Sequence, residues 1–154
     1  MHAPRFFMKK KVWKKFENDL KKTCLYYRKK KIALIDYNEV PTTGYGAPKT
    51  STIDFNGAIG PYGRSIAFDA KTTHNKTSFS LSNIKTHQLE YLRFHKDVGA
   101  DSYIFLQFVL LQKEDEFFKI PIEFILSYWD KEKKSIKYED IDQRWVTNVA
   151  DFLN

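Results

Sequence analysis

Two short segments of the chain carry carboxylates and a lysine at spacings that can place them in one small volume. One segment contains Asp54, and the other contains Asp69 and Lys71 separated by a single residue. Both segments are rich in strand-forming residues, and the turn at residues 60–63 between them predicts a β-hairpin. Alternate residues of a strand share a face, so Asp69 and Lys71 project together, as do Thr52 and Asp54. Carboxylates bind hard divalent cations such as Mg²⁺, and a nearby amine can position or activate a water. The spacing therefore indicates metal-dependent phosphodiester cleavage.

A long amphipathic helix is expected before this hairpin, over about residues 11–30. Apolar residues recur there at spacings of three and four, which mark one helix face: Trp13, Phe16, Leu20, Cys24 and Tyr27. Glu17 lies at the edge of that stripe, so its carboxylate faces inward or towards a cleft, where it can reach the same metal ions. A salt bridge from Glu17 to Lys14 or Lys21 is the alternative interpretation.

The remaining pattern alternates strands and helices. Residues 32–37 predict a strand, residues 38–51 a loop, and residues 72–83 a polar connection. A second amphipathic helix then follows, succeeded by a fully buried strand at 103–112, a strand at 117–120, a helix at 121–129, and one or two short helices at 139–153. We expect an α/β fold in which one mixed sheet of four to five strands is flanked by helices, within a single domain spanning residues 1–154.

Gln88 stands in the apolar stripe of the second helix, together with residues 84, 91, 92 and 95. A buried polar group without a partner costs about 1–3 kcal/mol, so Gln88 needs one. The expected partner is a water, a phosphate or an ion at the site of Asp54 and Asp69.

Charge is distributed unevenly along the chain. The net charge is +7, yet the first 31 residues contain twelve Lys and Arg against only two acids. Such a basic segment is typical of a surface that binds a polyanion such as nucleic acid. The single cysteine excludes an intramolecular disulfide and makes a structural zinc site improbable. No apolar run is long enough to span a bilayer or to act as a signal peptide, so a cytoplasmic location is expected.

In the segments that carry Glu17, Asp54, Asp69, Lys71 and Gln88, the chain resembles the RecU-type Holliday junction resolvases of the PD-(D/E)xK nuclease superfamily. The resemblance covers roughly residues 13–140 and is densest in Ser51–Gly57 and Gly63–Lys71, continuing through Asn75–Leu81 and His87–Glu90. It implies a restriction-endonuclease-like fold and a nuclease that resolves four-way DNA junctions during recombination and repair. The chain departs from the family pattern in three ways. Asp69 stands where a glutamate is usual, residues 39–51 form only a short loop in place of the family's stalk, and the chain is as short as phage-encoded members. Residues 1–10 are expected to be flexible.

The resemblance also implies roles for individual residues. Asp54, Asp69 and the backbone carbonyl of Ala70 would hold Mg²⁺ or Mn²⁺, with Glu17 reaching the same ions. Lys71 would contact the attacking water or a phosphate oxygen, Gln88 would orient the nucleophile, and Thr52 would support Asp54 or a water at the metal. Ordinary strand residues paired with lysines remain the alternative for the two aspartates, as does a plain strand threonine for Thr52.

DNA binding is expected to rely on phosphate contacts, because junctions are recognised by shape. The candidate contacts are Lys14, Lys21, Lys22, Arg28, Arg64 and Lys76. The resemblance further implies a two-fold homodimer that cuts two opposed strands, and a recombinase is a candidate partner. Two other functions stay open: an endonuclease of the same superfamily that tolerates many DNA structures, and a catalytically silent DNA-binding partner in recombination.

Overall fold

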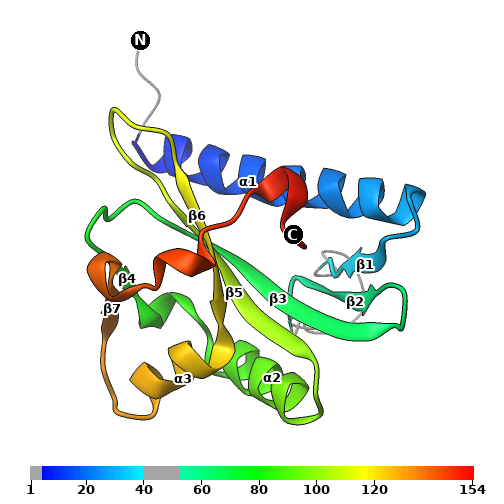
Figure 1. Ribbon diagram of the computed structural model, residues 1–154. Coiled ribbons are helices and arrows are strands. Elements are labelled where there is room, and N and C mark those ends of the chain that lie inside the picture. The colour runs from blue at the N-terminus through cyan, green and yellow to red at the C-terminus, as the bar shows by residue number, and fades with distance from the viewer. Residues whose placement is uncertain (1–4, 40–52) are drawn as a thin grey trace, which may run out of the picture.

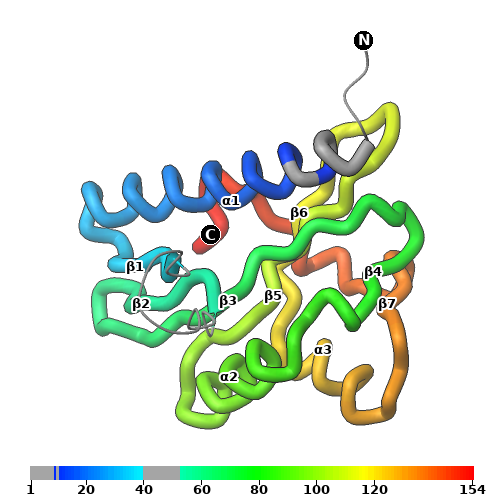
Figure 2. The backbone as a smooth tube through the Cα atoms, turned by 180° about the vertical axis from the view of Figure 1, so that it is seen from behind, coloured from blue at the N-terminus to red at the C-terminus, as the bar shows by residue number. Residues whose placement is uncertain are grey.

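The computed structural model describes residues 5–39 and 53–154, and it shows one sheet between helical layers (Figure 1). Helix α1 covers one face of the sheet, while helices α2 and α3 lie against the other, as the view from behind also shows (Figure 2). The helices and strands are α1 (Arg5–Lys29), β1 (Ala33–Tyr37), β2 (Phe55–Ile59), β3 (Arg64–Thr73), β4 (Ser78–Ser80), α2 (Thr86–Asp97), β5 (Asp101–Phe108), β6 (Glu116–Pro121), α3 (Ile122–Trp129) and β7 (Ser135–Lys137).

The main sheet has the strand order β1-β2-β3-β5-β6. Strands β1, β2 and β3 pair antiparallel, β3 pairs parallel with β5, and β6 returns antiparallel to β5. The parallel pair is possible because α2 carries the chain back across the sheet between β3 and β5. The predicted α/β fold with a single mixed sheet of four to five strands is confirmed.

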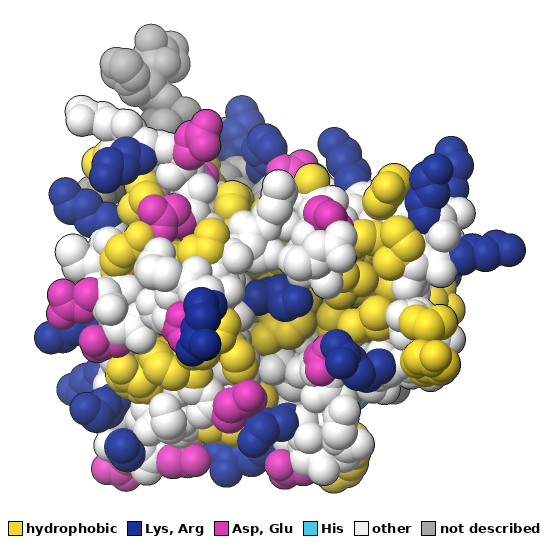
Figure 3. All heavy atoms as spheres, viewed as in Figure 1, with side chains coloured by type: hydrophobic (Ala, Val, Ile, Leu, Met, Phe, Trp, Pro, Cys, Tyr) yellow, Lys and Arg dark blue, Asp and Glu magenta, His cyan; other side chains and the backbone are white. Residues whose placement is uncertain are grey.

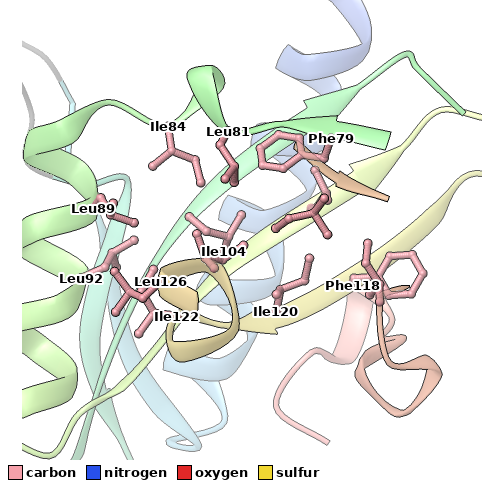
Figure 4. Close-up of a cluster of buried hydrophobic side chains, with 14 of the residues drawn as sticks. Phe79, Leu81, Ile84, Leu89, Leu92, Ile104, Phe118, Ile120, Ile122 and Leu126 are labelled. Carbon is pink, nitrogen blue, oxygen red and sulfur yellow. The ribbon is translucent and has the colours of Figure 1, made fainter. Parts of the chain in front are cut away.

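Alternation along β3 divides the core into two clusters. Ile66, Phe68 and Ala70 face α1 and join an aromatic cluster, in which the Phe68 ring stacks between Phe55 and Tyr103 at centroid distances of 4.7 and 4.8 Å. Ala67 belongs to the second cluster, which fills the space between the sheet and helices α2 and α3 (Figure 4). Since side chains alternate with a period of two, Asp69 and Lys71 project towards the α2 side of the sheet.

Several predicted boundaries differ from those of the structure. Helix α1 begins at Arg5, several residues before the predicted start, and Trp13 is partly exposed although the rest of its apolar stripe is buried. Strand β5 ends at Phe108, earlier than predicted. The prediction of a mere polar connection at residues 72–83 is wrong, because β4 lies there and pairs with β7 in a two-stranded sheet. Three 3₁₀ turns occupy the C-terminal segment: Tyr138–Asp140, Gln143–Trp145 and Val149–Asp151.

The surface carries lysine and arginine side chains along α1 (Figure 3). Exposed positions on that helix are Lys9, Lys11, Lys14, Lys15, Lys22, Arg28 and Lys29. Within the described residues, no helix is long and apolar enough to cross a membrane.

Candidate active site

Asp54 and Asp69 meet at the point where β2 begins. The register Phe55↔Phe68 places Asp54 beside Asp69 across the two strands. The Asp54 backbone N–H donates to Oδ1 of Asp69 at 2.6 Å, and the Ala70 N–H donates to Oδ2 of Asp54 at 3.0 Å. Each carboxylate is therefore fixed by the backbone of the other strand, so the two acids hold a defined position relative to each other.

Lys71 completes this group from the same face of β3. Its Nζ lies 3.4 Å from Oδ2 of Asp69 and donates to Oε1 of Gln88 at 3.0 Å. Asp69 is fully buried, and its Oδ2 makes no hydrogen bond despite the nearby ammonium. A buried carboxylate oxygen that is left without a hydrogen bond is unusual, because such oxygens normally find donors or ions.

Gln88 has two partners within the protein. Its Oε1 accepts from Lys71 Nζ and also from the Lys85 backbone N–H at 3.1 Å, at the start of α2. Sequence spacing shows the apolar stripe but not the strand opposite it, so it does not identify Lys71 as a partner; a water, phosphate or ion at this side chain stays a prediction. Gln88 thus links the N-terminus of α2 to the lysine of β3.

The electrostatics of the pair oppose full ionisation. Burial, together with the neighbouring Asp69 carboxylate, raises the pKa of Asp54 from 3.8 to about 7. Burial likewise raises the pKa of Asp69, although Lys71 acts in the opposite direction. Two close carboxylates with raised pKa values are stabilised when a positive charge arrives between them.

Glu17 is buried on α1, and its negative charge contributes to the raised pKa of Asp54. Its side chain is 1% exposed, and its Oε1 accepts from the Tyr37 hydroxyl at 2.7 Å. Lys14 and Lys21 approach the same oxygen at 3.3 and 3.6 Å, so the salt bridges considered from the sequence are present. Its other oxygen, Oε2, makes no hydrogen bond.

The donor set around Asp54 fits Mg²⁺ better than a metal that needs a complete protein cage. In the described part of the chain, no three or more His, Cys, Asp and Glu side chains lie close enough to hold a metal ion, so Glu17 forms no such group with the aspartates. The N–H and C=O of one strand residue point to the same side. The Ala70 carbonyl therefore points to the side on which its N–H meets Asp54. Mg²⁺ is commonly held by one or two carboxylates, with waters and substrate phosphates as its other ligands.

Two supporting residues were missed from the sequence. Tyr37 at the end of β1 holds Glu17, and Asn38 holds the segment that carries Asp54. The Asn38 N–H donates to the Asp54 carbonyl at 2.8 Å, and its side-chain amide donates to Ile53 O and to Asn56 Oδ1. The one sequence feature that could have identified them is a polar group at the end of an apolar strand. Ordinary loops show the same feature, so it does not distinguish a supporting residue. Thr52 and the predicted loop at 39–51, apart from Glu39, lie outside the described residues.

The predicted DNA-contacting cations are spread over several surfaces. Lys22 and Lys76 are exposed, whereas Lys21 is partly covered and its Nζ lies 3.8 Å from the centre of the Tyr37 ring. Arg28 pairs with Asp36 at 3.5 Å, and Arg64 pairs with Asp101 at the end of β3 remote from Lys71. Lys14, Lys21, Lys22 and Arg28 therefore share α1, while Arg64 lies on β3 and Lys76 between β3 and β4.

Comparison with known proteins agrees with the sequence pattern. The family model described as "Recombination protein U" matches residues 13–152. A Holliday junction resolvase RecU of Bacillus subtilis is 32% identical over 146 residues, covering 82% of this chain and 68% of the relative. One from Ligilactobacillus salivarius is 30% identical over 145 residues, covering 82% and 66%. One from Leuconostoc citreum is 38% identical over 95 residues, covering 60% and 44%.

The chain thus spans about half to two thirds of the length of these curated relatives. Among solved structures, the Holliday junction resolvase Hjc of Archaeoglobus fulgidus matches with a TM-score of 0.47 and 19% sequence identity. That match covers 92% of this chain and 99% of Hjc.

Proposed function

The chain belongs to the recombination protein U family, and from this premise we propose that it is a metal-dependent endonuclease that resolves four-way DNA junctions. One observation supports the chemistry above all others. Asp54, Asp69 and Lys71 converge, and a fully buried oxygen of Asp69 lacks a hydrogen bond. The Lys71 ammonium lies 3.4 Å from that oxygen without donating a hydrogen bond to it, so one cation stands against two close carboxylates, and a divalent ion would supply the missing positive charge.

Mg²⁺ or Mn²⁺ is the proposed cofactor. Asp54, Asp69 and the Ala70 carbonyl would hold the ion, and Glu17 is a more distant contributor that reaches the site through water. When bound, such an ion polarises a phosphate and lowers the pKa of water, which makes hydrolysis possible near neutral pH.

Lys71 supplies positive charge next to the reacting phosphate. Its Nζ donates one hydrogen bond to Gln88 and lies 3.4 Å from Asp69 without a hydrogen bond. An ammonium has three N–H donors, so others are available for the attacking water or for a non-bridging phosphate oxygen, where negative charge grows in the transition state. Gln88 is a positioning residue in this scheme, because it holds the ammonium in place through its Oε1 atom.

Four-way junction DNA is the proposed substrate. Resolution requires two opposed strands to be cut, and a two-fold homodimer presents two sites in that arrangement. The exposed lysines of α1 would bind backbone phosphates without reading sequence. We place this activity in the cytoplasm, with a recombinase as a candidate partner.

A structure-tolerant endonuclease is the second candidate function. It is favoured by the short connection between β1 and β2, which spans only residues 38–54. An enzyme with so short a connection between β1 and β2 has fewer residues there that could contact the open centre of a junction.

Cleavage assays separate these functions. The full chain is incubated with a mobile four-way junction, a linear duplex and a flap, each with Mg²⁺, with Mn²⁺ or with EDTA. The proposal expects metal-dependent paired nicks that are much faster on the junction. Equal rates on all three substrates would favour the structure-tolerant enzyme. Junction binding without any metal-dependent cut would instead identify a silent binding partner.

A further inference from the structure

The β5–β6 hairpin lies at the same end of the sheet as Lys71. Strand β5 runs parallel to β3, with Lys71 opposite Leu106 and Thr73 opposite Phe108. The pairing extends one residue further, because the Val109 N–H donates to the Thr73 carbonyl at 2.9 Å. Both backbone views show the hairpin projecting beyond the sheet beside the N-terminal half of α1 (Figures 1 and 2).

A chain of polar side chains ties this hairpin to the strand that carries Lys71. Thr72 Oγ1 donates to Oε1 of Gln107 at 3.0 Å, and Gln107 Nε2 donates to Oδ2 of Asp115 at 2.9 Å. The other Asp115 oxygen accepts from the Leu110 N–H at 3.3 Å. Gln107 is only 4% exposed, so its amide is largely shielded from water. The tip is thereby held at a set position relative to the catalytic strand, which the cleavage chemistry itself does not require.

The tip presents an apolar side chain among residues of net negative charge. Leu111 is 83% exposed, and beside it Lys113 is outnumbered by Glu114, Asp115 and Glu116, a net charge of −2. Such a tip gains little by lying along a phosphate backbone. The cations that can hold phosphates are nearby on α1, where Lys9, Lys11 and Lys15 are exposed. An exposed leucine gains free energy when it covers an unstacked base, as the apolar wedges of other DNA-binding proteins do.

We propose that Leu111 is a wedge that contacts unstacked bases at a branch point of the DNA substrate. This inference rests on the proposed nuclease function and adds the structural feature by which branched DNA is recognised. Leu111 follows Leu106 by five residues, which span at most about 17 Å in an extended strand. At about 3.4 Å per nucleotide step, the contacted base lies within about five steps of the scissile phosphate.

The experiment compares the full-length wild-type protein with Leu111→Ala in EDTA, where no metal-dependent cleavage occurs. A 2-aminopurine base is placed beside the branch point of an immobile four-way junction, and the same base is placed in a linear duplex. Fluorescence reports unstacking, and titrations at several KCl concentrations give the affinity and its salt dependence. Val98→Ala is the matched control, because Val98 is 67% exposed and lies at the opposite end of β5.

Wild type and Val98→Ala are expected to raise the fluorescence of the junction and not that of the duplex. Leu111→Ala should lose this rise and bind the junction about five- to twenty-fold more weakly, with duplex affinity and salt slope unchanged, because no phosphate contact is removed. If the wild type binds the junction and Leu111→Ala behaves identically, the wedge proposal is refuted and the proposed nuclease function is not. Equal losses on junction and duplex refute the wedge proposal too. A wild-type protein that neither binds nor cuts branched DNA removes the proposed function, and the wedge with it.

Discussion

Replacing Asp54 by asparagine is expected to stabilise the metal-free protein, although it should abolish cleavage. Burial and the Asp69 carboxylate raise the pKa of Asp54 from 3.8 to about 7. Asparagine carries no charge, yet its oxygen can still accept the Ala70 N–H and its amide can donate towards Asp69. The variant therefore keeps the hydrogen bond and loses the electrostatic penalty.

The sign and size of this effect depend on pH. Well below pH 3.8 the Asp54 carboxyl is protonated in both the folded and the unfolded chain, so it does not destabilise the fold. Between 3.8 and about 7 the unfolded chain has released the proton while the folded chain retains it, so the stability of the wild type falls as pH rises. Above about pH 7 the ionised Asp54 lowers the free energy of unfolding by its full amount. At about 1.4 kcal/mol per pKa unit, this loss of stability is at most about 4 kcal/mol. Asp54 is only half-buried, and we therefore expect about 1–3 kcal/mol.

Urea unfolding in EDTA at pH 8 and pH 4 measures this difference. For a chain of this size, a change of 1 kcal/mol in the free energy of unfolding also shifts Tm by about 2–4 °C, so thermal unfolding resolves the expected gain at pH 8 as well. The gain should shrink to about 0.5 kcal/mol or less at pH 4. Asp36→Asn is the control, because Asp36 is exposed on β1 and its ion pair with Arg28 is long, so its change should stay within about 0.5 kcal/mol. If Asp54→Asn proves equally or less stable than wild type at pH 8, Asp54 is an ordinary structural acid and the reasoning fails.

Further outcomes follow from the same contacts. Lys71→Met should abolish metal-dependent cleavage in a single-turnover assay, and its junction affinity in EDTA should stay within about threefold of the wild type. Residual cleavage above a few per cent would contradict the role of Lys71. The rise in Tm that Mg²⁺ induces in the wild type should be larger at pH 8 than at pH 6. The pKa values of Asp54 and Asp69 are raised, so at pH 6 the ion must displace protons that are largely gone at pH 8. An equal rise at both pH values would contradict this. Tyr37→Phe removes the donor to buried Glu17 and should cost about 1–3 kcal/mol in urea unfolding, whereas an unchanged midpoint would argue that water replaces the hydroxyl. Burial raises the pKa of Cys24 to about 12, so a thiol reagent should label it only on unfolding, and rapid labelling of the native protein would show that α1 opens.

Much of the fold was predictable because its elements follow local periodicity. The three- and four-residue spacing on α1 correctly identified the buried face that contains Phe16 and Leu20, and it placed Glu17 inside. The strand pattern and the turn at residues 60–63 identified the β2–β3 hairpin. The β4–β7 pair escaped prediction because each strand has only three residues, too few for a period of two to be recognised.

The amino-acid sequence by itself determined that Asp69 and Lys71 share a face and that Asp54 belongs to the other arm of the same hairpin, because a strand's alternation and a short turn are local properties of the chain. Only the tertiary structure decided which groups meet these side chains. Gln88 reaches Lys71, Tyr37 reaches Glu17, and Asp115 ties Gln107 to the hairpin tip through the packing and pairing of separate elements. Periodicity fixes the direction in which a side chain points, but the partner in that direction depends on how helices and strands pack, which spacing alone does not encode.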